Sequence, residues 1–223
     1  MSDDKVNSAQ RRFRLPPNAT EVVLLRHGAT IDAVPGQPFP LTPDGHGDPP
    51  LSPLGETQAA AACARLAADP PSLIAVTTLR RTHQTAAALV AATGLEPLVV
   101  PELREVHLGE WEAGEWRIRM ASADPIALRV LTEQRWDVIP GGESSEAFGR
   151  RVRAGVQAVA TAAGPGKRAV AVVHGGVIGE LCRQATESRA FAFVHAENCS
   201  LSRLIVWADG GITLQGFNDT SHL

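Results

Sequence analysis

The chain contains 223 residues, of which 44% are hydrophobic and 20% charged. At roughly 150 residues per domain, this length predicts one compact domain. The composition excludes wholesale disorder. The formal net charge is −3, which argues against a polyanion-binding surface, so nucleic acid is not an expected partner.

The N-terminus and the cysteine content bear on location. Residues 1–20 are predicted to form a flexible basic tail, and residues 21–223 one domain. The arginines of 11–14 resemble a twin-arginine export signal, but Pro16-Pro17-Asn18 stand where its apolar stretch belongs. Three scattered cysteines without a Cys-x-x-Cys pair argue against disulfides and favour a reducing, cytoplasmic location. No apolar run approaches the ~18 residues of a membrane span, so no membrane partner is expected.

The first half of the chain alternates short apolar runs with helical patterns. Strands are predicted at 21–25, 73–76 and 98–100, and helices at 53–68 and 82–92. Ser52-Pro53 provides an N-cap followed by a proline suited to a first helical turn. The intervening segment 33–53 is rich in Pro, Gly and Asp, and a loop of that length inside a compact domain is usually functional.

The second half predicts short helices at 116–121 and 126–133, a longer helix at 144–163 and the clearest buried strand at 169–173. Strands 201–207 and 212–217 are joined by a turn sequence typical of an antiparallel hairpin. Alternating strands and helices predict a three-layer α/β/α sandwich with a mostly parallel central sheet. The hairpin would add an antiparallel edge strand.

Two histidines follow predicted strands, and each precedes a glycine. These are His27, in Arg26-His27-Gly28, and His174, in His174-Gly175-Gly176. Ligands of such sheets bind beyond the carboxyl ends of the strands, so the two histidines are expected to share one site. The planar donor fork of Arg26 matches phosphate or carboxylate. An isolated Arg-His-Gly is weak evidence for a binding site. The alternative interpretation is that His27 is a loop histidine that binds no ligand.

Two further segments carry chemistry. The first, 79–86, opens a helix with Arg80 and Arg81, and a helix N-terminus beside arginines is an anion site. The alternative to an anion site is that Arg80 and Arg81 are simply exposed to solvent. The second, 103–112, places several acids near Trp111 and Trp116, a setting in which a carboxyl group can stay protonated and act as a general acid.

These four motifs, in this order and spacing, resemble the histidine phosphatase superfamily, the phosphoglycerate-mutase-like proteins. The resemblance extends from Val22 onward and includes segments 51–59 and 140–144. It implies a phosphoryl transfer whose roles fall on five residues: the nucleophile His27, the phosphoryl-binding Arg26 and Arg81, the pocket-completing His174, and the proton donor Glu105.

The implied chemistry is consistent without a metal or cofactor. Two guanidinium groups and an imidazolium on His174 would offset the charge of a phosphate ester. His27 must attack as a neutral ring, so its far nitrogen is expected to donate to a backbone carbonyl. Glu105 would protonate the leaving oxygen and then accept a proton from water.

The chain departs from the family pattern at two positions. Ala33 replaces a common phosphate-binding asparagine, and Ala113 replaces a common glycine. Thr30 is expected to bind substrate through its hydroxyl, and His46 and Asp48 are further candidates for the donor that Ala33 lacks.

The stretch from Glu105 to Gly142 is too short for the long insertion that shields the intermediate in similar mutases, which favours a metal-independent phosphatase of small phosphate monoesters. The alternatives are a phosphoglycerate-type mutase and a non-catalytic phosphate-binding pseudophosphatase. A histidine-rich metal protein is disfavoured because no closely spaced ligand set occurs.

The sequence leaves open whether the C-terminal segment 218–223 folds back near the site or frays. It also leaves open which of five basic residues meet an acidic substrate and which are surface charges: Arg80, Arg104, Arg117, Arg119 and His107.

Overall fold

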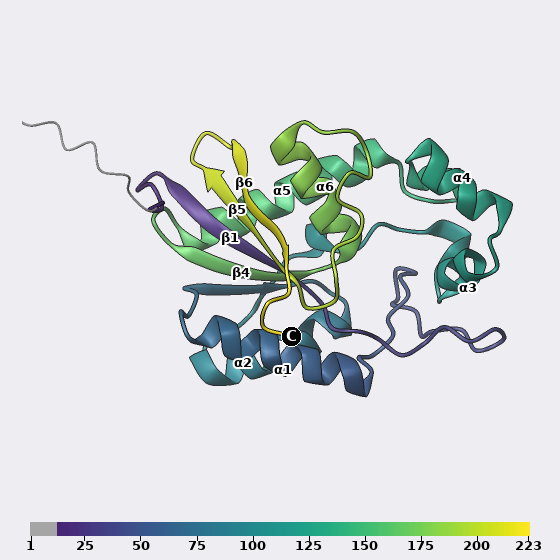
Figure 1. The fold of residues 1–223 in the computed structure, drawn as a ribbon, viewed down its shortest axis with the longest axis horizontal. Coiled ribbons are helices and arrows are strands. Elements are labelled where there is room, and N and C mark those ends of the chain that lie inside the picture. Colours follow the sequence, from purple (N-terminus) through teal and green to yellow (C-terminus); the bar gives the residue numbers. More distant parts are fainter. Residues whose placement is uncertain (1–12) are drawn as a thin grey trace, which may run out of the picture.

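A computed structural model describes residues 13–223 as a six-stranded sheet between two helical layers (Figure 1). The strands are β1 (Ala19–Arg26), β2 (Leu73–Val76), β3 (Leu98–Val99), β4 (Arg168–Val173), β5 (Leu201–Trp207) and β6 (Ile212–Asp219). The helices are α1 (Pro53–Ala67), α2 (Arg80–Thr93), α3 (Glu115–Ala121), α4 (Pro125–Glu133), α5 (Ser145–Ala163) and α6 (Gly175–Thr186).

The sheet order is β3-β2-β4-β1-β5-β6, and β1 to β4 all run parallel. β5 pairs antiparallel with both β1 and the edge strand β6. The predicted sandwich is therefore confirmed, although the strand that runs against the others lies one position inside the edge. Arg26 pairs with Val173 at the last register position of β1 and β4, so the residues that follow both strands emerge side by side.

The two faces of the sheet bury separate cores. Val22 and Leu24 of β1 face the layer of α5 and α6, and Val23 and Leu25 face α1 and α2. Successive side chains of a strand point to opposite faces, so a strand covered on both sides is apolar throughout. This burial fixes β1 and β4 rigidly and so fixes the loops that leave them.

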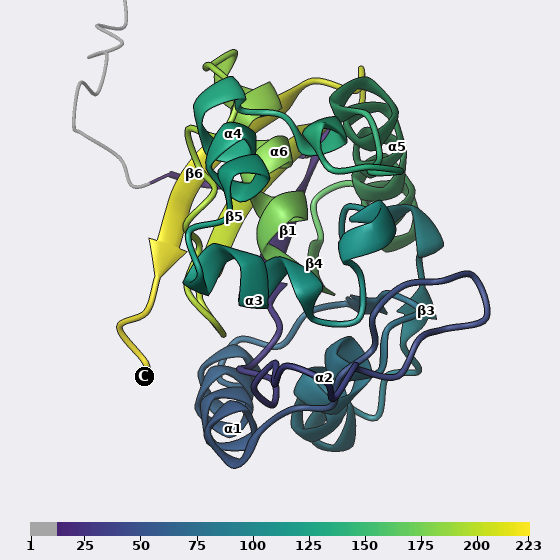
Figure 2. The same ribbon diagram turned by 90° about the vertical axis from the view of Figure 1, so that its right-hand side faces the viewer.

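One end of the molecule is covered by irregular structure, here called the cap: residues 104–143 together with the loop 29–52. Figures 1 and 2 show α3, α4 and that loop at the end of the sheet toward which β1 runs. The cap therefore covers the carboxyl edge of the parallel strands, where ligands of such sheets bind.

Element boundaries differ slightly from the predictions. β1 begins at Ala19, so two residues assigned to the tail belong to the strand and are buried. Residues 1–12, with most of the arginine-rich motif, lie outside the described residues. α1 begins as predicted, with the Ser52 hydroxyl accepting the N–H of Gly55 over 3.2 Å. Within residues 13–223 none of the helices is long and apolar enough to span a bilayer.

Candidate active site

The loop after β1 holds His27 in one orientation. Its backbone N–H donates to the Val173 carbonyl over 3.0 Å, and its ring Nδ1 lies 2.8 Å from the carbonyl oxygen of Gly28. A carbonyl oxygen only accepts, so Nδ1 carries the hydrogen and Nε2 keeps a lone pair. At Gly28 an added Cβ would lie 2.4 Å from the carbonyl oxygen of Gly55, so this close approach requires glycine. The predicted bond to a backbone carbonyl is confirmed.

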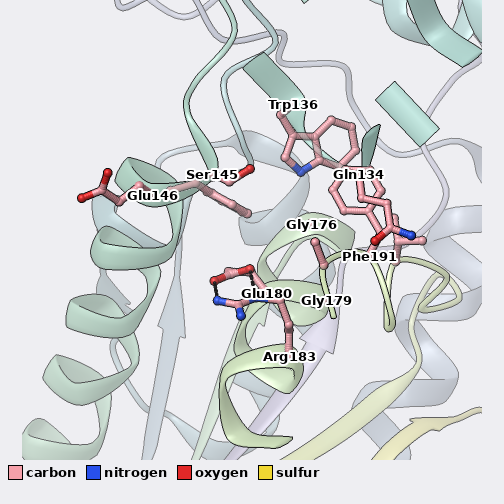
Figure 3. Close-up of a pocket in the computed structure, with 12 residues that line it drawn as sticks. Gln134, Trp136, Ser145, Glu146, Gly176, Gly179, Glu180, Arg183 and Phe191 are labelled. Atoms are coloured by element: carbon pink, nitrogen blue, oxygen red, sulfur yellow. Dashed lines mark hydrogen bonds and ion pairs between the residues drawn. The ribbon is translucent and has the colours of Figure 1, made fainter. Parts of the chain in front are cut away.

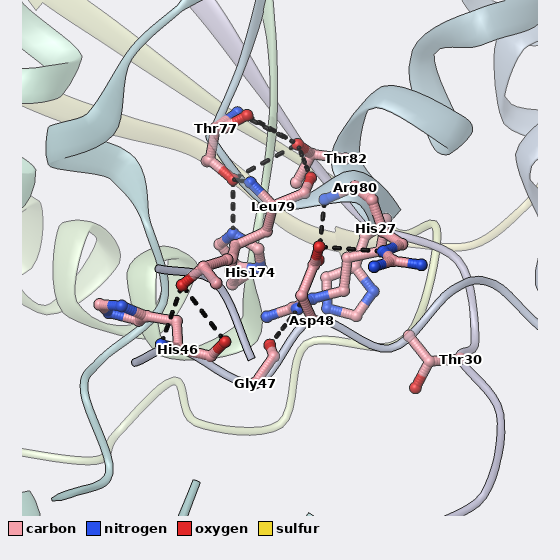
Figure 4. A network of polar contacts seen from close by, with 12 residues as sticks. His27, Thr30, His46, Gly47, Asp48, Thr77, Leu79, Arg80, Thr82 and His174 are labelled. Atoms are coloured by element: carbon pink, nitrogen blue, oxygen red, sulfur yellow. Dashed lines mark hydrogen bonds and ion pairs between the residues drawn. The ribbon is translucent and has the colours of Figure 1, made fainter. Parts of the chain in front are cut away.

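His174 lies beside His27, with ring centroids 5.2 Å apart. The ring is fully buried, its Nε2 is 3.0 Å from the hydroxyl of Thr77, and its Nδ1 has no hydrogen-bond partner within the described part of the chain. Thr77 directly follows β2, so three neighbouring strands each contribute one residue at the same edge (Figure 4). An unpartnered buried nitrogen beside His27 is a group that a bound anion would satisfy.

Two arginines flank the histidines. Arg26 donates through Nη1 to the carbonyl of Ala196, and its buried Nε has no partner among residues 13–223. Arg81 is 7% exposed and donates through Nη1 to the carbonyl of Gly47 over 2.9 Å. The carboxylate of Asp48 stands 3.9 Å from the same nitrogen. Both guanidinium groups are therefore held by the backbone on one side and keep further N–H groups for a ligand.

Burial and like charges set the protonation of the site. Burial, reinforced by the charges of Arg81 and Arg26, lowers the pKa of His27 well below its ordinary value. Burial and the charge of Arg81 likewise lower the pKa of His174. Both rings are thus neutral near pH 7, which suits a nucleophile at His27 and corrects the expectation of an imidazolium at His174. Burial lowers the pKa of Arg81 only to about 10, so this group stays charged.

Glu105 lies against the first turn of α6. Its Oε1 accepts the N–H of Val106 over 3.0 Å, and its Oε2 accepts the N–H of Gly176 over 3.1 Å. A Cβ at Gly176 would lie 2.4 Å from Oε1, so the second glycine of the His-Gly-Gly motif makes room for the acid. Each carboxyl oxygen keeps a lone pair that can hold or accept a proton.

These groups face one cavity of about 330 Å³, within the size range of small-molecule sites. Its lining includes Arg26, His27, His46, Arg81, Glu105, Trp111, Trp116 and Arg117. The rings of Trp111 and Trp116 stack with centroids 6.1 Å apart, so they both pack together and contribute to the cavity wall. A second cavity of about 390 Å³ shares Arg26, Glu105 and Trp116 with the first.

A third cavity, of about 220 Å³, lies behind Gly176 (Figure 3). Its most polar side chain, Glu180, accepts two N–H groups of Arg183 and one of Gln184. This network is internally satisfied, and none of the predicted catalytic residues lines the cavity.

Not every predicted ligand-binding residue joins the site. The Thr30 hydroxyl donates to the carbonyl of Ile31 over 3.3 Å and points away from His27 (Figure 4). A backbone bridge between Thr30 and Leu51 fixes that position, so the predicted contact with substrate finds no support. Asp48 accepts the backbone and side-chain N–H groups of Arg80, so it orients arginines rather than donating to a ligand. His46 does line the cavity.

The C-terminal segment does fold back near the site. Asn218, the penultimate residue of β6, accepts the backbone N–H of Glu197 through Oδ1 over 2.6 Å. In the same loop, Asn198 donates to the carbonyl of His27 over 2.9 Å. The segment therefore supports the loop that contacts the backbone of His27.

Sequence reasoning missed two supporting residues. Thr77 could have been found, because it follows a predicted strand in the same way as His27 and His174. Glu112 could not, because its partners are remote: Oε2 accepts the N–H of Gly47 over 2.7 Å, and Oε1 accepts that of Leu108 over 2.9 Å. Glu112 thereby joins the two parts of the cap.

A neutral histidine, the half-buried Arg26, the buried Arg81 and an acid around one cavity form a site suited to phosphoryl transfer. Comparison with known proteins identifies the family. The profile of the histidine phosphatase superfamily (branch 1) matches residues 22–220. A glucosyl-3-phosphoglycerate phosphatase of Mycobacterium tuberculosis is 36% identical over 170 residues, covering 73% of this chain and 74% of the relative. A probable phosphoglycerate mutase of Yersinia enterocolitica is 29% identical over 211 residues, covering 91% and 94%.

The fold comparison agrees. The native structure of a mycobacterial glucosyl-3-phosphoglycerate phosphatase matches with a TM-score of 0.72 at 29% identity, covering 91% of this chain and 100% of that one. The chain belongs to the histidine phosphatase superfamily. The predicted family, fold and enzyme class, a phosphoric monoester hydrolase, are thereby confirmed, and the mutase alternative is also represented among the relatives.

Proposed function

We propose that the protein is a metal-independent phosphatase that hydrolyses small phosphate monoesters through a phosphohistidine at His27. The observation that carries this proposal is the fixed, neutral ring of His27, whose free Nε2 faces a cavity shared with Arg26 and Arg81. Two buried guanidinium groups offset the charge of a phosphoryl group without a cation.

In the first step, Nε2 of His27 attacks phosphorus and the bond between phosphorus and the ester oxygen breaks. The leaving oxygen takes a proton from Glu105, which becomes a carboxylate. Arg26 and Arg81 bind the non-bridging oxygens. If the Thr77 hydroxyl donates to Nε2 of His174, the hydrogen of that ring lies on Nδ1, the unpartnered atom, and a neutral His174 still donates to the phosphoryl group.

In the second step, a water molecule attacks the phosphohistidine while the Glu105 carboxylate accepts one of its protons. The bond between nitrogen and phosphorus breaks, inorganic phosphate leaves and the neutral ring of His27 is restored. The backbone bonds to both carboxyl oxygens hold Glu105 in place for both proton transfers.

Hydrolysis is favoured over transfer back to a product. The short cap leaves an open cavity that water enters, and a relative named as a phosphatase matches this chain at 36% identity over 73% of its length. A mutase remains the second candidate because such relatives cover most of this chain.

The three cysteines of the described chain are free and buried, which supports a cytoplasmic location.

The test is release of inorganic phosphate from a panel of monoesters with a chelator present. We expect turnover by the wild type and none by His27→Ala. The control is Arg150→Ala, which removes an exposed side chain of α5 that pairs with the exposed Glu146 and should keep activity within a few-fold. Activity retained by His27→Ala would contradict the assigned nucleophile, and a strict magnesium requirement would contradict the metal-free mechanism.

A further inference from the structure

Five basic residues are candidates for meeting an acidic substrate, and of these five only Arg117 lines the cavity of His27. Three arginines are ion-paired: Arg80 with Asp48, Arg104 with Asp44, and Arg119 with Glu115 and Asp124. His107 uses its Nδ1 to accept the N–H of Gly109 over 3.1 Å. An arginine already bound to a carboxylate has little free charge for a ligand.

Arg117 is the exception. Arg117 lines the cavity of His27 and is exposed to solvent. Within residues 13–223, no carboxylate oxygen lies within 4.0 Å of its guanidinium. One N–H donates to the carbonyl of Ile31 over 3.2 Å, and the group lies 5.4 Å from the centre of the Phe39 ring. These contacts hold the guanidinium in place while most of its N–H groups stay available.

The charge of Arg117 adds to a pocket that is already positive. It contributes to lowering the pKa of His27 and of Arg81, behind the larger effects of burial. Desolvation, followed by the charge of Arg26, lowers the pKa of Arg117 itself. Arg26, half-buried, and Arg81, buried, lie beside His27 and match one phosphoryl group, so a third, exposed guanidinium exceeds what that group requires.

We propose that Arg117 binds a second anionic group, a carboxylate on the alcohol portion of the substrate, and so selects phosphate esters of hydroxy acids. This proposal rests on the phosphatase function proposed above. The planar fork of arginine matches a carboxylate, and the position of Arg117 on the solvent side of the cavity places it on the portion of the ester that leaves.

The test compares two esters that differ in one group: 3-phosphoglycerate carries a carboxylate where glycerol 3-phosphate carries a hydroxymethyl group. In Arg117→Gln we expect kcat/KM to fall by about tenfold or more for 3-phosphoglycerate, mainly through KM, and by less than threefold for glycerol 3-phosphate. Inhibition by vanadate, which probes the phosphoryl pocket alone, should stay unchanged.

Three further variants sharpen the test. Arg117→Lys keeps the charge without the fork and should keep part of the preference, so it covers a folding defect of the glutamine variant. Arg129→Gln removes a charge from the surface of α4, where that arginine pairs with Glu133, and should change neither ester. His27→Ala should abolish turnover of both.

The outcomes separate the two proposals. Equal losses for both esters and weaker vanadate inhibition would place Arg117 in the phosphoryl pocket and overturn this inference while leaving the phosphatase intact. Unchanged kinetics in Arg117→Gln would also overturn it. If the wild type hydrolysed neither ester, the proposed function would fail for this substrate class. Equilibrium binding of the same two esters to wild type and Arg117→Gln would then decide the role of Arg117 by itself.

Discussion

The proposed phosphoryl-binding pocket and the cap are built in different ways. In the pocket, His27 and His174 each follow a buried parallel strand, and the register of β1 with β4 brings them together. The cap has little regular structure and is held by single side chains such as Glu112, which bonds to both of its segments. The pocket thus inherits its geometry from the sheet, whereas the cap depends on a few remote contacts.

From this difference we infer that the pocket carries out the reaction and that the cap determines which substrate binds. A site at the strand ends tolerates little movement, because the strands beneath it are buried on both faces. The cap contributes Trp111, Trp116 and Arg117 to the same cavity, on segments that can change without disturbing the sheet. We therefore expect changes at the pocket, and at Glu105 where the cap begins, to alter kcat, and changes elsewhere in the cap to alter KM or stability.

Among changes that leave the catalytic side chains in place, the largest effect is expected from Gly176→Ala, where pocket and acid meet. The new Cβ would lie 2.4 Å from Oε1 of Glu105, so the carboxyl group must move. A misplaced general acid typically costs about 10²-fold in rate. We expect kcat to fall by about that factor while vanadate still inhibits, as measured by steady-state kinetics.

Gly175→Ala is the matched control, because its Cβ would meet the guanidinium of Arg26 at an ordinary contact distance, 3.4 Å from Nε, and would leave Glu105 in place. Its kcat should fall far less than that of Gly176→Ala. Equal losses in the two variants would show that this turn does not position Glu105.

A smaller effect is expected on stability at low pH. The pKa values of His27 and His174 lie well below their ordinary value in the folded protein, so below about pH 6.5 the unfolded chain binds more protons. The free energy of unfolding should therefore fall as the pH drops below about 6.5, by up to about 1.4 kcal/mol per pH unit for each ring.

Urea unfolding at pH 7.5, 6.5 and 5.5 measures this dependence. His174→Gln removes one of the two rings, so its free energy of unfolding should fall less steeply than that of the wild type. Identical slopes would mean that His174 is not buried in its neutral form.

The smallest effect is expected in the cap. Ala113 has a φ of 58°, in the left-handed region that favours glycine. Ala113→Gly should raise the free energy of unfolding by about 0.5–1 kcal/mol. Ala88→Gly, on the exposed side of α2, should lower it by about 1 kcal/mol. Thermal unfolding of both variants checks the signs, and destabilisation by Ala113→Gly would refute the strain.

The sequence predicted the pocket better than the cap for the same structural reason. His27 and His174 could be placed because strand ends are visible in apolar runs and the sheet brings them together. Thr30 was misplaced because its orientation depends on a backbone bridge to Leu51, which local pattern does not reveal. Glu112 and the free charge of Arg117 were hidden because both depend on which remote groups lie nearby. The neutral state of His174 follows from burial, which also emerges only in three dimensions.

The central claim is that His27 becomes phosphorylated during turnover. Brief incubation with a substrate ester, an alkaline quench that preserves phosphohistidine, and peptide mapping by mass spectrometry measure this directly. The structure predicts one phosphoryl group on the peptide that contains His27, and none in His27→Ala. Turnover without that modification, or equal labelling of the variant, would contradict the mechanism.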